Sequence, residues 1–437
     1  MALEKLFEEH VHSTACSNQP LYDDTVDFRE IQKLYSDAAK RFGQEKPQGI
    51  DLLKFLSMNG IENPKDEKYY PSKNYMLLVS ELQARQNGNV LTELEVDATN
   101  LEQSLLELTE AAENSQQIRD LYRIRKQTTK PDGGISLEEA VRLKHCMSQG
   151  RQLFLSGLSS SLQVKPLSYF YAITAYSYAI IILNNPVRFR KDMLPGSHGL
   201  NYLPNDVHIQ FGGDTARGTF SDLHGSFPEN SIRSSNLEIV GENLESIINY
   251  NKKKYTASLG TLLSMVPEVR NYYKIVTNRP SRTHTMSVHS ETRYSRHSYV
   301  FLIGDGQSRP AEGELRFAFP VGQIAEENGR SKIVVQSEDV SKLRVTSYTD
   351  IHGDLWFIEN PFFPVILPEI NLHFLILAIF SNLMRYRPDE WGELVDNNVS
   401  MGISLLVRHY FSAIERKFNV LILRNISQFY PFAPRSV

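Results

Sequence analysis

One apolar stretch, from Lys165 to Leu183, constrains the fold more than any other part of this sequence. After Lys165 it contains no further charge, so a helix across it would have no strongly polar face. Pro166 suits the first helical turn, where its missing N–H has no partner to lose, and Asn184-Asn185-Pro186 is an end signal. The stretch is shorter than the roughly 20 residues of a comfortable membrane span. It therefore predicts a buried core helix and no membrane association.

The composition is that of a globular protein with no dominant charge. Of the 437 residues, 41% are hydrophobic and 22% are charged, and the net charge is −4. A protein without a basic excess needs a local patch to contact nucleic acid. The two cysteines, Cys16 and Cys146, lie far apart and outside any Cys/His cluster, so we expect neither a disulfide framework nor a metal site. Early acids and the lack of an apolar segment near Met1 argue against a signal peptide, and we expect a cytoplasmic protein.

The chain divides at a strong helix breaker near residue 130. Residues 1–130 form a charged region with helical spacing, which we interpret as a helical N-terminal extension that binds a protein partner or a second copy. Lys130-Pro131-Asp132-Gly133-Gly134 then interrupts the pattern. Ser136 and Glu139 have the spacing of a capping box, which predicts a new helix start. Residues 131–437 are therefore expected to form the main domain.

Within the main domain the hydrophobic period changes between about 298 and 359. Short β-branched or aromatic runs separated by turn residues predict strands there, at 299–303, 315–319, 332–335, 343–346 and 353–358. Helical spacing returns after Pro368. The predicted class is α+β, predominantly helical with an inserted antiparallel β-sheet region.

Three separated segments together resemble the YaaC-like family of bacterial proteins. Their order and spacing match that family over roughly 140–425, and their residues are Gln152-Leu153-Phe154 with Lys165 to Tyr171 and His198-Gly199-Leu200; Ser258 to Leu263 with Val266-Pro267-Glu268 and Tyr272; and Leu383 to Trp391 with Phe411 and Lys417-Phe418. The resemblance implies a bacterial lineage, and it implies no catalytic residues because the family has no established activity. By analogy alone, large bacterial proteins of this sort suggest a role in phage defence.

His198 is the best single candidate for a catalytic residue. It lies in Gly196-Ser197-His198-Gly199, a loop that follows the predicted core helix. Catalytic residues are frequent on loops held by rigid scaffolds, and histidine titrates near neutral pH. The alternative is a structural loop histidine.

Three basic residues beside apolar helices are candidates for anion binding. Arg385 and Arg387 could hold a phosphate or carboxylate, as could Lys165 at the start of the core helix. The alternative for the arginines is charge complementation at a helix C-terminus, with Pro388 ending the helix.

Residues 270–297 are the most basic segment, with interleaved tyrosines. This composition is typical of a surface that contacts the phosphate backbone of RNA or DNA, here through Arg279, Arg282, Arg293 and Arg296. Arg279 and His284 also have the Arg-x4-His spacing of HEPN-type ribonucleases, where such a pair lies on or beside a helix, whereas Pro280 interrupts it here. The alternative is a solvated loop whose charge balances acidic surface elsewhere.

No phosphate-binding loop, dinucleotide fingerprint or metal-ligand motif is present, so no cofactor is expected. Our leading hypothesis is a YaaC-like protein of unestablished activity that acts by binding nucleic acid. The first alternative is a metal-independent RNA or nucleotide hydrolase that uses His198 or the Arg279/His284 pair. The second is a structural subunit that docks on a protein through residues 1–130.

Overall fold

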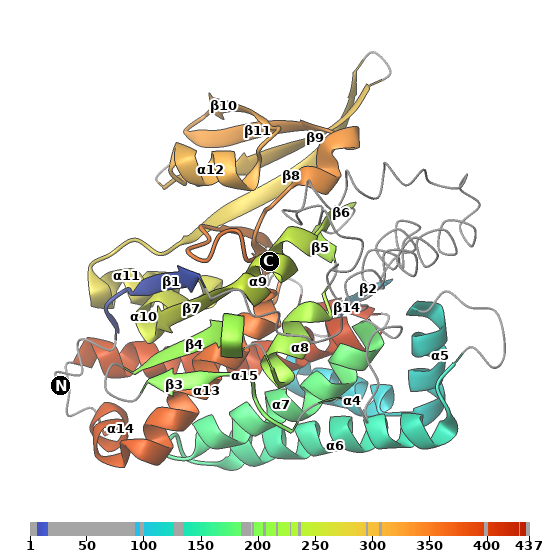
Figure 1. Ribbon diagram of the computed structural model, residues 1–437, viewed down its shortest axis with the longest axis vertical. Coiled ribbons are helices and arrows are strands. Elements are labelled where there is room, and N and C mark those ends of the chain that lie inside the picture. Colours follow the sequence, from blue (N-terminus) through green and yellow to red (C-terminus); the bar gives the residue numbers. More distant parts are fainter. Residues whose placement is uncertain are drawn as a thin grey trace, which may run out of the picture.

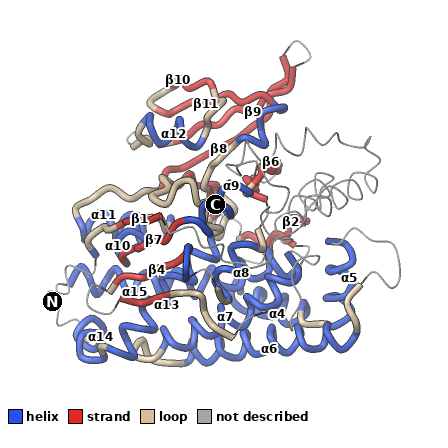
Figure 2. The backbone as a smooth tube through the Cα atoms, in the orientation of Figure 1, coloured by secondary structure: helices blue, strands red, loops and turns tan. Residues whose placement is uncertain are grey.

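Helices form one side of the molecule, and most strands gather above them (Figures 1 and 2). The computed structural model describes residues 7–15, 92–96, 100–125, 134–184, 194, 196–203, 207–215, 217–227, 229–234, 237–293, 296–305, 308–396, 401–427 and 429–433. Within these residues more of the chain lies in helices than in strands, and the strands pair mainly in antiparallel sheets. The predicted α+β class is confirmed.

The helical layer is built around long helices that lie side by side. The helices are α4 (Leu101–Ala112), α5 (Ser115–Arg125), α6 (Leu137–Ser159), α7 (Lys165–Asn184), α8 (Thr219–Gly225), α9 (Leu244–Lys252), α10 (Leu259–Ser264), α11 (Arg270–Thr277), α12 (Glu312–Ala318), α13 (Glu369–Tyr386), α14 (Pro388–Val395) and α15 (Met401–Ile426). Short 3-10 turns are η5 (Gly213–Thr215), η6 (Pro267–Val269) and η7 (Ser337–Lys342).

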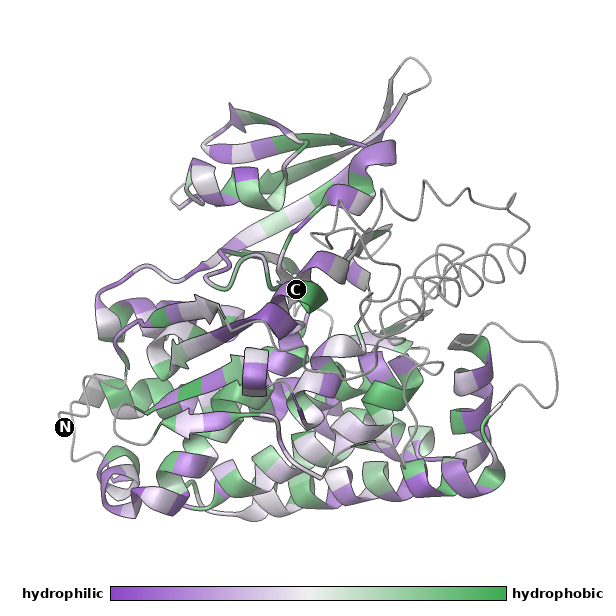
Figure 3. Ribbon diagram, in the orientation of Figure 1, coloured by the Kyte–Doolittle hydropathy of each residue, from purple (hydrophilic) through white to green (hydrophobic). Residues whose placement is uncertain are grey.

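Helix α7 is the predicted core helix. It begins at Lys165, with Pro166 in its first turn, and ends at Asn184. Its length and composition would allow it to span a membrane, but 78% of its apolar window is buried inside the fold. Neighbouring α6 begins as predicted, because the Ser136 hydroxyl accepts a hydrogen bond from the Glu139 backbone N–H at 3.1 Å. Polar and apolar residues alternate along α6, at the outer edge of the helical layer (Figure 3).

Two glycines of α6 receive two tyrosine rings of α7. A Cβ atom on Gly150 would lie 2.5 Å from the Tyr176 ring, and one on Gly157 would lie 2.3 Å from the Tyr169 ring. Both rings are fully buried. Gly150 and Gly157 are seven residues apart, as are Tyr169 and Tyr176, and the later glycine meets the earlier tyrosine. This order is expected for antiparallel helices in close contact. Because Gly150 and Gly157 have no side chains, α6 and α7 can pack at this short distance.

The strands form four sheets in the described part of the chain. The strands are β1 (Val11–Ala15), β2 (Thr92–Glu95), β3 (Asn201–Leu203), β4 (His208–Gly212), β5 (Glu229–Ser234), β6 (Leu237–Glu242), β7 (Lys253–Ser258), β8 (Thr283–Arg293), β9 (Arg296–Ile303), β10 (Gln323–Glu327), β11 (Arg330–Gln336), β12 (Ser347–Thr349), β13 (Leu355–Ile358) and β14 (Phe429–Phe432). One sheet has the order β1-β7-β4-β3, and a larger one has the order β10-β11-β9-β8-β13-β12. β5 pairs with β6, and β14 lies parallel to β2.

The larger sheet contains the predicted β region and differs from the prediction at three places. Its strands begin at Thr283, earlier than expected. Residues 315–319 are not a strand, because Leu315 and Ala318 turn inward at helical spacing in α12 while Phe317 stays 54% exposed. Residues 343–346 lie beside the sheet without joining it. There the Arg344 N–H donates to the Ala318 carbonyl at 2.9 Å, and the Val345 carbonyl accepts from Asn230 Nδ2 at 2.6 Å.

The predicted boundary near residue 130 lies outside the described residues. The described part of residues 1–130 packs on the rest of the chain. Leu105 and Ile118 are buried in the main core, and buried Glu113 forms a two-bond ion pair with Arg151 of α6 at 2.8 and 3.0 Å. At the N-terminal end, β1 pairs with β7 in the register Val11↔Ala257. The predicted contact with a partner or a second copy through this region stays a prediction.

We expect a methyl group at the α6–α7 contact to destabilise the fold. Gly157→Ala should lower the free energy of unfolding by about 1–3 kcal/mol, because the buried Tyr169 ring has no room to retreat. Gly392→Ala in α14 is the matched control, since no heavy atom lies within 4 Å of the new Cβ and alanine favours helix. Urea unfolding monitored by circular dichroism measures both. Equal midpoints for Gly157→Ala and wild type would contradict this account of the packing.

Candidate functional site

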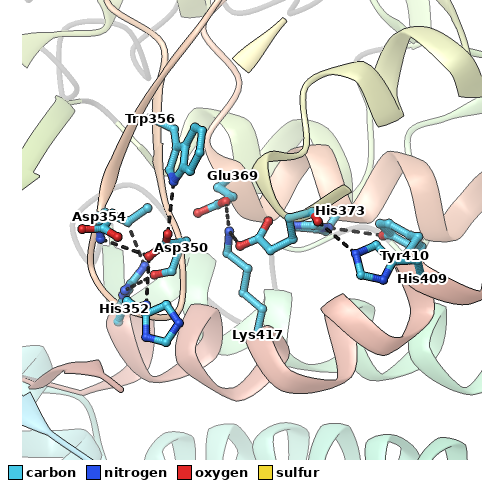
Figure 4. Close-up of polar contacts among 12 residues, drawn as sticks. Asp350, His352, Asp354, Trp356, Glu369, His373, His409, Tyr410 and Lys417 are labelled. Carbon is cyan, nitrogen blue, oxygen red and sulfur yellow. Dashed lines mark hydrogen bonds and ion pairs between the residues drawn. The ribbon is translucent and has the colours of Figure 1, made fainter. Parts of the chain in front are cut away.

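A buried ammonium group lies between two carboxylates in the helical layer. Lys417, from the middle of α15, is only 1% exposed. Its Nζ atom donates to Glu268 Oε1 of η6 at 2.6 Å and to Glu369 Oε1 at the first residue of α13. Figure 4 shows Lys417 pointing from its helix toward Glu369. The Lys417 ammonium group therefore joins η6, α13 and α15, which are far apart in the sequence.

The charges of this cluster do not cancel when all three groups are ionised, because two carboxylates share one ammonium group. Burial opposes a charged Lys417, but Glu268 and Glu369 outweigh it and raise the lysine pKa. Burial also raises the pKa of Glu369, against the attraction of Lys417. The lysine therefore stays an ammonium group, and burial favours the protonated form of Glu369.

A second buried pair lies beside the cluster. His373 Nδ1 lies 3.2 Å from the Tyr410 hydroxyl, and burial together with the Lys417 charge holds the His373 pKa well below its usual range. The imidazole is therefore neutral. Among the described residues, His373 Nε2 and Glu268 Oε2 are buried and have no hydrogen-bond partner. Figure 4 shows His373, Tyr410 and His409 on the side of Lys417 away from the Asp350 turn.

Glu369 also lines a cavity of about 250 Å³. Its lining residues come mainly from β5, β12, the start of α13, the end of α15 and β14. Its lining combines apolar side chains with a few polar ones: Phe227, Asn230, Ser231, Arg233, Asn243, Ser347, Tyr348, Thr349, Leu355, Ile366, Leu367, Pro368, Glu369, Ile370, Leu421, Arg424, Asn425 and Tyr430. Apolar walls with a few converging polar groups are typical of small-molecule sites.

Two arginines hold Tyr430 in the cavity wall. The guanidinium carbons of Arg424 and Arg233 lie 4.1 and 4.7 Å from the centre of the Tyr430 ring. The tyrosine hydroxyl lies 2.8 Å from Thr349 Oγ1. Arg424 donates to Thr349 Oγ1 at 2.9 Å and, at 3.4 Å each, to the carbonyl oxygens of Asp350 and Pro431. All the hydrogen-bond acceptors of Arg424 among the described residues are neutral oxygens.

The turn behind Thr349 is held by Asp350. Its Oδ1 accepts from the backbone N–H groups of His352 and Asp354 at 2.9 and 3.0 Å, and its Oδ2 accepts from the Trp356 indole at 3.2 Å (Figure 4). Burial raises the pKa of Asp350, with a smaller contribution from Asp354. This carboxylate fixes the β12–β13 turn and hence the cavity wall that carries Thr349.

The comparison with protein families matches the YaaC-like protein family over residues 107–426, most of the chain. The chain belongs to this family. No curated protein and no solved structure matches it. The match begins within α4, upstream of the predicted boundary near residue 130. Two of the segments that carry the sequence resemblance supply two of the three buried ionic groups of this YaaC-like protein, Glu268 from the second and Lys417 from the third.

His198 lies away from the cavity, on the surface of α7. Its ring makes edge contacts with Phe170 and Tyr171, at 4.9 and 6.3 Å between centroids. Burial lowers its pKa, and the nearby Arg385 charge lowers it further. His198 Nδ1 is buried without a hydrogen-bond partner among the described residues. The fold therefore brings His198 and Arg385 into electrostatic range of each other.

The three residues predicted to bind anions have partners of their own. Lys165 forms an ion pair with Glu415 of α15, and Arg387 forms one with Glu390. Arg385 donates to the Ser381 carbonyl at 3.3 Å and to Asn382 Oδ1 at 3.1 Å. These contacts agree with the helix-end alternative for Arg385.

The structure does not place Arg279 and His284 on a common helix. Arg279 is exposed in the turn after α11. His284 is buried in β8, with Nε2 3.0 Å from Glu359 Oε1. Arg282 forms an ion pair with Glu9 at 2.6 Å, which fastens the segment before β1. No described contact joins Arg279 to His284.

Arg293 and Arg296 are paired in register at the end of the β8–β9 hairpin. This hairpin extends away from the helical layer (Figure 1). The described part of 270–297 contains α11, β8 and the first residues of β9, so it is not the solvated loop of the alternative interpretation.

Loss of the buried ammonium should destabilise this YaaC-like protein strongly. Lys417→Met leaves two buried carboxylates without a cation, and we expect a loss of about 3–5 kcal/mol in the free energy of unfolding. Chemical denaturation measures the effect. The control is Arg316→Gln at the exposed pair with Glu312, where a change within about 0.5 kcal/mol is expected. The triple variant Lys417→Met/Glu268→Gln/Glu369→Gln should be more stable than Lys417→Met, and the opposite order would contradict a charge-based role.

Proposed function

We propose that this YaaC-like protein binds a small organic anion in the cavity beside Glu369. The observation that supports the proposal most is Arg424, a cavity-wall cation whose described hydrogen bonds all go to neutral oxygens. A guanidinium group forms strong paired hydrogen bonds with carboxylates and phosphates. Arg233 adds a second positive charge to the same wall.

The remaining walls favour a ligand with an apolar body. Tyr348, Ile366, Leu421 and Tyr430 line the cavity and offer apolar contact area. The volume of about 250 Å³ lies just below the usual range of ligand pockets, roughly 300–1,000 Å³. A compact acid with a short aliphatic or aromatic chain fits both the charge and the size.

Matched anionic and neutral compounds test the charge requirement. Isothermal titration calorimetry would compare 3-phenylpropionate with 3-phenylpropanamide, and 4-methylpentanoate with 4-methylpentanamide. Each pair has nearly the same shape and differs in the carboxylate. We expect the acids to bind at least about tenfold more tightly than the amides, since a charged hydrogen bond contributes about 1.5–3 kcal/mol. Failure of both acids to bind would contradict the proposal.

Variants locate the binding in the cavity. Arg424→Gln should weaken the binding of the acids by about tenfold or more, because it removes the cation. Ser347→Phe fills the cavity without changing its charge and should abolish binding. Arg316→Gln, on the exposed face of α12, serves as the control and should bind like wild type. Circular dichroism and the unfolding midpoint show whether each variant is folded.

A second candidate function, binding of RNA or DNA through 270–297, is supported by the hairpin end. Arg293 and Arg296 lie there at the far end of two long strands, and Arg279 is exposed nearer the helical layer. Other cations of the region already pair with carboxylates, such as Arg282 with Glu9 and Arg270 with Asp305. A role in phage defence would depend on such binding.

Gel shifts with single-stranded RNA and DNA across a salt series test this second function. Arg279→Glu/Arg293→Glu/Arg296→Glu should abolish a salt-sensitive shift, because like charges repel the phosphates. Arg282 is left unchanged, since its pair with Glu9 fastens the N-terminal strand. The matched control is Arg309→Glu/Arg316→Glu, which changes two exposed arginines outside residues 270–297. Equal shifts for both variants and wild type would contradict binding through the hairpin.

A further inference from the structure

The cavity contains unmet hydrogen-bond acceptors as well as cations. Among the described contacts of Glu369, only Oε1 is engaged, by Lys417. The side chain lines the cavity and is 10% exposed. Its second oxygen is therefore left to accept a hydrogen bond from a group inside the cavity.

Asn243 provides a second acceptor in the same wall. It is 2% exposed, and its Nδ2 donates to the Phe227 carbonyl at 2.8 Å. That bond fixes the orientation of the amide, because a flipped amide would place two oxygens face to face. Its Oδ1 is buried without a hydrogen-bond partner among the described residues. A buried polar atom without a partner carries a cost of about 1–3 kcal/mol, which a hydrogen-bond donor that reached it from the cavity would remove.

The two acceptors and the cation line one cavity of about 250 Å³. Burial raises the pKa of Glu369, while Lys417 and, more weakly, the Arg424 charge lower it. Arg424 therefore acts electrostatically on the Glu369 carboxyl across the cavity wall. Lys417 already engages one oxygen of the Glu369 carboxyl. A ligand would therefore contact the other Glu369 oxygen through one of its groups and the Arg424 guanidinium group through another.

We propose that the ligand is a small zwitterion of the amino-acid class. Its carboxylate binds Arg424, its ammonium group donates to Glu369 and Asn243, and its apolar side chain lies against Tyr348, Ile366 and Leu421. This inference rests on the proposed anion-binding function and adds the requirement for a cationic donor. A plain carboxylic acid would leave both acceptors unsatisfied.

Amino acids and their deaminated counterparts test the requirement directly. Titration calorimetry on the full-length wild-type protein would compare L-phenylalanine with 3-phenylpropionate, and L-leucine with 4-methylpentanoate. Each pair differs only in the ammonium group. We expect at least one amino acid to bind about tenfold more tightly than its counterpart, since one charged hydrogen bond suffices for that factor. Equal or weaker binding of the amino acids would overturn the inference and leave the anion-binding function standing, whereas no binding by either class would overturn both.

Glu369→Gln identifies the acceptor. The amide keeps an oxygen for Lys417 and places an N–H₂ donor where the free carboxylate oxygen lies, so it should repel an ammonium group. We expect the preference for L-phenylalanine over 3-phenylpropionate to fall from about tenfold to about onefold. Retained binding of 3-phenylpropionate shows that this variant keeps its site. A preference unchanged in Glu369→Gln would overturn the assignment to Glu369, and if the variant does not fold, the comparison of paired ligands on wild type decides.

Discussion

The Lys417 ammonium group is the contact on which the arrangement of the helical layer depends most. It joins η6, α13 and α15, which are far apart in the sequence. Burial of three ionic groups is costly, and only good geometry offsets that cost. A shift of α13 along α15 would leave at least one carboxylate buried without a cation. We infer that this penalty selects one register of the helices, which apolar packing alone would leave less sharply defined.

Helix α15 can serve as the centre because it presents ionic groups on two sides. Glu415 and Lys417 are two residues apart, about 200° around the helix. Glu415 accepts from the Tyr169 hydroxyl of α7 at 2.7 Å and pairs with Lys165, while Lys417 faces α13. The same Tyr169 ring and the Tyr176 ring also pack against the glycines of α6. One continuous set of contacts therefore connects the outer helix α6 to the cavity wall at Glu369.

The elements whose signals lie within a few residues of sequence were predicted correctly. The predictions failed for segments whose structure depends on contacts with distant parts of the chain. Ser136 and Glu139 predict the start of α6, and the uncharged run after Lys165 predicts α7. Residues 315–319 alternate like a strand, but the exposed ion pair between Glu312 and Arg316 and the burial of Leu315 and Ala318 favour a helix. The basic composition of 270–297 concealed two strands, because their pairing with β11 and β13 is not visible in a single segment.

The candidate site was harder to predict because each of its residues has an ordinary local explanation. Glu369 is an acid in the first turn of a helix, where the dipole favours it, and Lys417 is one cation in an amphipathic helix. Arg424 and Tyr430 lie near the end of the chain, and Arg233 is almost 200 residues away in sequence from both. Only the fold shows that Glu369 belongs at once to the ionic cluster and to the cavity. Lys417 neutralises much of the charge of Glu369, and the fold therefore tolerates a carboxylate in the cavity wall. One ammonium group cannot balance two carboxylates, so a cationic group of a ligand would compensate the remaining negative charge.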